Sequence, residues 1–127
     1  MTRTNRMVAF GAALACVAAG VAVLVSTAQQ PRPEQWKKVN DAVNKGLPKT
    51  AIKELEPIIE SALRDKAYPE AIKAICKKIV LEGNIEGNKP EEKITRMQAA
   101  ITTAPPEMHP VMHAVLAHWY WQYFQQN

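Results

Sequence analysis

The sequence has little cysteine and no stretch in which polar and apolar residues alternate. Its 127 residues include two cysteines, Cys16 and Cys76, and Cys16 lies inside an N-terminal apolar run. One thiol therefore remains in the body of the protein, which excludes a disulfide framework. Because the period-two pattern of β-strands is missing, we predict an all-α fold.

The sequence also lacks the signatures of common catalytic and nucleic-acid-binding sites. It has no glycine-rich phosphate loop, no supportable Ser-His-Asp arrangement and no pair of buried carboxylates. We therefore predict that the protein is not an enzyme and uses no cofactor. The net charge of +4 is spread along the chain without a basic stripe interleaved with aromatic residues, so nucleic acid is not an expected partner.

The first 28 residues have the three-part organisation of an export signal. Arg3 and Arg6 are followed by an uncharged apolar run, residues 7–25, and then by small residues. The run is also long enough to span a bilayer, so a cleaved signal peptide and an uncleaved membrane anchor both stay open. Either one places Gln29 onward on the periplasmic or extracellular side of the cytoplasmic membrane. Residues 29–33 are predicted to form a polar linker.

Residues 34–127 are predicted to form one helical domain of about five antiparallel helices, arranged as α-hairpins in the manner of helical repeats. The apolar spacing and the positions of proline and glycine predict helices over residues 33–45, 46–63, 69–82, 90–104 and 107–127. Residues 83–88 are predicted to form a loop.

Individual residues carry further expectations. We expect Gly46 to end the first helix in the left-handed conformation. Pro57 is expected to kink the second helix without ending it, because the apolar period continues through it. Leu47 and Val80 are placed on buried faces, and Cys76 is expected to be buried and inert.

The last predicted helix is apolar nearly all the way round. It carries five of the chain's aromatic side chains within nine residues: Trp119, Tyr120, Trp121, Tyr123 and Phe124. The preceding helices can cover one side of it, so we expect two or three of these side chains to stay exposed. We predict that they form a docking surface, and that the helical domain continues beyond Asn127.

His109 and His113 lie four residues apart on the same helix, a spacing that can bind a metal ion or haem. No thiolate or carboxylate follows them at a distance that would complete a tetrahedral site. We therefore prefer the interpretation that they are ordinary helical histidines, and predict no metal.

Several segments together are familiar: Trp36–Val39, Lys45–Ala51, Ile72–Ala74, Ala104-Pro105, His113 and Tyr120–Tyr123. In this order they resemble the N-terminal helical region of large exported bacterial proteins of the alpha-2-macroglobulin family. Members of that family are multidomain chains whose macroglobulin-like β-sandwich domains trap proteases, in some cases with a reactive thioester. This sequence has no Cys-x-Glu-Gln thioester motif, no bait region and no β-sandwich pattern.

The resemblance thus implies a leading helical piece of a protease-trapping protein, acting as a non-enzymatic scaffold or interaction module. Its partners would be the following domains of the same chain or another protein, and the membrane through residues 7–25 if that run is not cleaved. A free-standing exported helical-repeat module that binds peptides or proteins is the alternative.

Overall fold

The computed structural model describes residues 32–126, so the predicted export segment and most of the predicted linker lie outside the described residues. The described part of the chain folds into helices without any strand, and the all-α prediction is confirmed. The elements are α1 (Pro33–Asn44), α2 (Pro48–Arg64), α3 (Tyr68–Ile85), α4 (Pro90–Thr103), the short 3-10 helix η1 (Pro106–Met108) and α5 (His109–Gln126).

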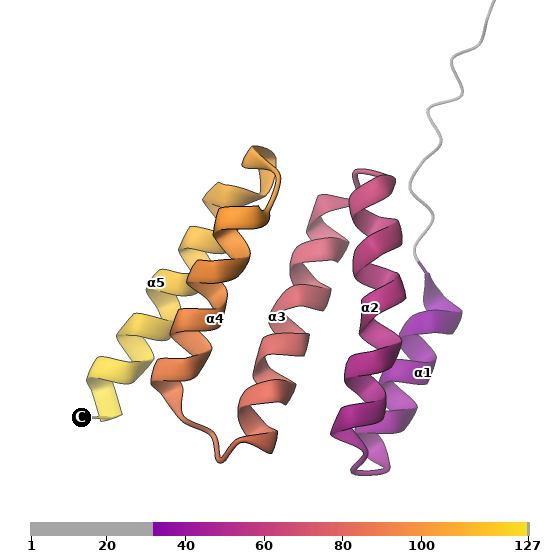
Figure 1. Ribbon diagram of the computed structural model, residues 1–127, viewed down its shortest axis with the longest axis horizontal. Coiled ribbons are helices and arrows are strands. Elements are labelled where there is room, and N and C mark those ends of the chain that lie inside the picture. The colour runs from indigo at the N-terminus through magenta and orange to yellow at the C-terminus, as the bar shows by residue number, and fades with distance from the viewer. Residues whose placement is uncertain (1–31, 127) are drawn as a thin grey trace, which may run out of the picture.

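The five α-helices lie side by side in chain order and alternate in direction (Figure 1). Each packs mainly on the helix before it and the helix after it, with η1 contacting both α3 and α5. The result is a short linear array in which α1 and α5 occupy the two ends, and in which α2, α3 and α4 each have a helix on both sides.

Prolines begin several helices of the array, and residues with positive φ follow several helix ends. Each of the first four α-helices has a proline in its first two positions, where the missing N–H would have had no helical partner. Gly46 adopts φ +68° after α1, as expected, and the Leu47 N–H donates to the Ala42 carbonyl at 2.9 Å. Lys66 repeats this geometry after α2 with φ 56°.

Pro57 lies inside α2, which continues through it to Arg64. The proline occupies the exposed side of the helix, so its ring is accommodated without disturbing the buried face. Ser61, one turn later, donates its hydroxyl hydrogen to the Pro57 carbonyl at 2.7 Å.

Three predicted boundaries are wrong by two or more residues. The second helix begins at Pro48 and not at residue 46. The segment beginning at Gly83 is not loop from its start, because α3 continues to Ile85. Gly87 and Asn88, which follow the helix, both have positive φ. The Asn88 N–H donates to the Gly83 carbonyl at 2.7 Å, which closes this end. The last helix begins at His109 and not at residue 107, because η1 occupies the preceding residues.

The core has two clusters. The first joins α2 to α5 around Ile72, Met97, Met108 and Met112, and the second joins α1, α2 and α3 around Val39, Leu55 and other buried side chains. Residues of α2 and α3 belong to both clusters, so these two helices connect the halves of the array.

Candidate interaction surfaces

Helix α5 differs from the other helices in having no Asp, Glu, Lys or Arg among its 18 residues. Its buried side, represented by Met112, Leu116 and Trp119, packs into the first core cluster. We define the outer face of α5 by side chains that point away from this cluster: Val111, Ala114, Ala117, Trp121 and Phe124, all of which are exposed. This helix therefore ends the array with an exposed surface that carries large apolar side chains and no permanent charge.

The five aromatic residues of the predicted docking surface do not all share this face. Three are exposed, in agreement with the expected number: Tyr120 at 36%, Trp121 at 63% and Phe124 at 70%. Trp119 is only 8% exposed and is part of the core, where the Lys93 ammonium lies 4.9 Å from the centre of its ring. Its inclusion in the docking surface is wrong, because its direction on the helix faces α4.

The two tyrosines belong to the margin of the surface. Tyr123 is half-buried and packs against the first core cluster. The hydroxyl oxygen of Tyr120 accepts a hydrogen bond from Gln98 of α4 at 3.0 Å, which ties this ring to the neighbouring helix. Trp121 and Phe124 are thus the large side chains that α5 presents outward.

The two histidines considered as metal ligands, His109 and His113, lie close together on α5. Their rings lie edge to face with centroids 6.2 Å apart. The Nε2 atom of His109 lies 3.0 Å from the Ala104 carbonyl oxygen, so this nitrogen carries the hydrogen and donates it. Within residues 32–126 no three or more His, Cys, Asp or Glu side chains are grouped closely enough to hold a metal ion.

Cys76 is half-buried, and therefore more open than the buried position that we expected. It lies at the edge of the first core cluster, and burial raises the pKa of its thiol above the ordinary value. A raised pKa lowers the fraction of thiolate, which is the nucleophilic form. Val80 on the same helix and Leu47 before α2 are also more open than expected, at 38% and 48% exposed.

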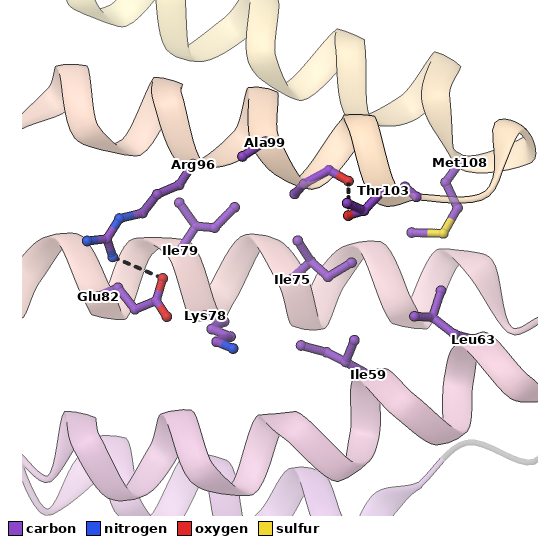
Figure 2. A pocket seen from close by; sticks show the side chains of 12 residues that line it. Ile59, Leu63, Ile75, Lys78, Ile79, Glu82, Arg96, Ala99, Thr103 and Met108 are labelled. Carbon is purple, nitrogen blue, oxygen red and sulfur yellow. Dashed lines mark hydrogen bonds and ion pairs between the residues drawn. The ribbon is translucent and has the colours of Figure 1, made fainter.

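The structure contains a groove that the sequence did not suggest (Figure 2). It has a volume of about 380 Å³ and runs along α3, between α2 and α4. Ile75 and Ile79 of α3 form its floor, Ile59 and Leu63 of α2 form one wall, and Met108 closes one end. The other wall is a run of short side chains on α4 and at its C-cap: Ala99, Ala100, Thr103 and Ala104.

The far end of the groove is charged. Arg96 donates to Glu82 at 3.0 Å and also to Glu86, and the hydrogen bond from Arg96 holds the pKa of Glu86 below its ordinary value. Lys78 lies 3.4 Å from Glu56 of α2. Lys78, Glu82 and Arg96 line the groove, whereas their partners Glu56 and Glu86 lie outside its lining.

A second polar cluster ties the start of α1 to α3. The Trp36 indole N–H donates to the Glu70 carboxylate at 2.8 Å, and the Arg32 guanidinium donates to the same carboxylate. Lys73 lies 4.4 Å from the centre of the Trp36 ring. All of these groups are paired within the protein, so the cluster has a structural role.

None of the helices in the described residues combines the length and the hydropathy that crossing a bilayer requires. Comparison of the chain with protein-family models, with curated proteins and with solved structures found no match. The outer face of α5 and the groove between α2 and α4 are the two surfaces of the described residues that could bind a partner.

Proposed function

We propose that the helical domain is a non-enzymatic interaction module that uses the outer face of α5 to dock another helical segment. The observation that carries the proposal is the exposure of Trp121 and Phe124 on a helix without permanent charge. Outward charged side chains keep a helix in water, and each of α1 to α4 has several charged residues. α5, at the end of the array, has no charged side chains of this kind.

The large exposed side chains of α5 would supply most of the binding energy. Complete burial of one such side chain stabilises a complex by roughly 1.5–3 kcal/mol. Trp121 and Phe124 are 63% and 70% exposed, so most of this gain is still available to a partner. Ala114 and Ala117 lie on the same face, and their short side chains let a second helix approach closely.

The setting that we propose is an exported protein of the alpha-2-macroglobulin type, with this domain at its front. The resemblance supports that setting, and the arrangement of Arg3, Arg6 and residues 7–25 supports export. The partner of α5 would then be a following domain of the same protein. A free-standing exported module that binds peptides is the second candidate, and the groove along α3 favours it.

The docking proposal can be tested on residues 29–127, which contain both core clusters in full. We expect this domain to bind a hydrophobic dye and to self-associate, and Trp121→Lys to reduce both without lowering the thermal midpoint. Thr102→Lys places the same charge at an exposed site on α4 and serves as the matched control. A wild-type domain that stays monomeric, ignores the dye and unfolds cooperatively at high temperature would contradict the proposal.

Export and the macroglobulin-like parent protein are tested by separate experiments. A reporter fused after Gln29 should be active only outside the cytoplasm, and activity inside would refute export. Reading the gene past codon 127 distinguishes the two candidates: an open frame leading into β-rich sequence supports the macroglobulin-like parent, whereas a stop codon favours the free-standing module.

A further inference from the structure

All three histidines of the chain, His109, His113 and His118, lie on α5. The same helix has no Asp, Glu, Lys or Arg. Histidine is the side chain that gains a positive charge as the pH falls from about 8 to about 5, whereas Asp and Glu stay negative and Lys and Arg stay positive over most of this range. The charge carried by α5 is therefore set by its histidines, and mild acid makes this helix positive.

His118 lies within the outer face of α5. It is exposed, and it follows Ala114 by four residues and precedes Trp121 by three, so that its side chain neighbours both on the helix surface. His113 lies at the edge of the face, where its ring packs edge to face against the ring of His109. A partner helix that covers Trp121 would also cover His118.

No carboxylate of this domain stands ready to neutralise a positive His118. α4 and η1 pack on the buried side of α5. Their charged side chains are Glu91, Glu92, Lys93, Arg96 and Glu107. Lys93 lies over the ring of Trp119, and Arg96 is held by two carboxylates. Within residues 32–126, His118 itself has no ion pair or hydrogen bond.

We propose that mild acid releases the partner of α5, because docking on the outer face requires a neutral His118. The inference rests on the docking function proposed above and adds its regulation. Enclosure by an apolar partner disfavours the charged form of a histidine. Docking should therefore be strongest above about pH 6.5, the ordinary value for free histidine, and each histidine that must stay neutral in the complex lowers the affinity about tenfold for each pH unit below it.

The test measures self-association of residues 29–127 by analytical ultracentrifugation at about pH 7.5 and about pH 5.5, a range over which most carboxylates stay ionised. Each associating copy contributes one His118. We expect the association constant to fall at least about tenfold between the two pH values, which corresponds to about 1.4 kcal/mol. Circular dichroism at both pH values should show the same helix content, so that the change is one of association and not of folding.

Variants assign the response to His118. His118→Gln keeps a polar side chain that cannot gain charge, and it should associate equally well at both pH values. His118→Lys carries a permanent charge and should associate weakly at both. His113→Gln makes the neutral change at the edge of the face and should keep most of the pH response, while Thr102→Lys on α4 should keep all of it.

Three results would overturn the proposal, and they differ in what they leave standing. Wild-type association that is equal or stronger in acid would refute acid release but leave docking on α5 intact. A His118→Gln variant that dissociates in acid as wild type does would show that another group controls the response. No association at either pH would refute docking on α5 and this inference together.

Discussion

Gly83 lies in the last turns of α3, where most other residues have a higher helix propensity than glycine. It is buried, and a Cβ atom built there meets no atom within 4 Å. Glycine in a helix interior costs about 1 kcal/mol relative to alanine, chiefly through the entropy of the unfolded chain. We expect Gly83→Ala to raise the free energy of unfolding by about 0.5–1 kcal/mol, as measured by urea denaturation.

Gly46 is the control for this substitution. Its φ of +68° lies in the left-handed region, so Gly46→Ala should destabilise the domain by about 1 kcal/mol. A loss of stability in Gly83→Ala would show that the space beside this glycine is filled in solution.

Glu70 connects the start of α1 to α3 and gives the fold a predictable dependence on pH. Its partial burial alone would raise its pKa, but the hydrogen bonds from Trp36 and Arg32 outweigh this effect and lower the pKa below the ordinary value of 4.5. A carboxyl with a lowered pKa in the folded state stabilises the protein above the pKa of the unfolded state. This stabilisation is lost as the pH falls through the lowered pKa.

We therefore expect Glu70→Gln to reduce the free energy of unfolding at pH 7 by about 1–2 kcal/mol, since a charged hydrogen-bond acceptor is lost. The difference from wild type should shrink as the pH is lowered below 4.5. Urea denaturation between pH 7 and pH 3 measures this, with Glu34→Gln on the exposed side of α1 as the control. A difference that is constant with pH would argue against an ionised Glu70 in this cluster.

At the scale of the element, α5 contains two tryptophans two residues apart with opposite environments. Trp119 is 8% exposed and Trp121 is 63% exposed. Trp119→Ala should destabilise the domain by about 3–5 kcal/mol because it leaves a cavity in the first core cluster. Trp121→Ala should change stability by less than about 0.5 kcal/mol while it reduces dye binding. Thermal unfolding of both variants measures this, and equal losses would show that the orientation of α5 is wrong.

Periodicity predicted the helices and most of their buried faces, but it failed where the backbone departs from regular helix. Leu47 fits the apolar arc of α2 by spacing, yet it precedes the first helical residue and its φ of −110° turns its side chain outward. Glycine and asparagine after Glu82 suggested a loop, whereas both Gly83 and Asn84 lie in α3, and Gly83 is buried.

The groove could not have been predicted from the sequence. Its volume depends on how far apart α2 and α4 lie on the two sides of α3, and this distance is set by tertiary packing. The alanines of α4 were visible in the sequence, but short side chains also occur where helices pack closely, so the pattern alone does not distinguish a gap from a tight contact.

For the whole molecule, the linear order of helices predicts a gradient of local stability. α2 and α3 contribute to both core clusters, whereas α1 and α5 each contribute to one and have a neighbouring helix on one side only. We expect amide hydrogen exchange to be slowest in α2 and α3 and faster in α1 and α5. Mass spectrometry of exchanged fragments measures this, and uniform protection of all five helices would indicate a single cooperative unit.

The absence of permanent charge on α5 has a consequence for the kinetics of association. Electrostatic attraction accelerates encounters between proteins, and salt removes that acceleration. A partner that approaches the outer face of α5 finds no charge on that helix to guide it, so its association rate constant should stay near the roughly 10⁵–10⁶ M⁻¹s⁻¹ of unsteered pairs and change little with ionic strength.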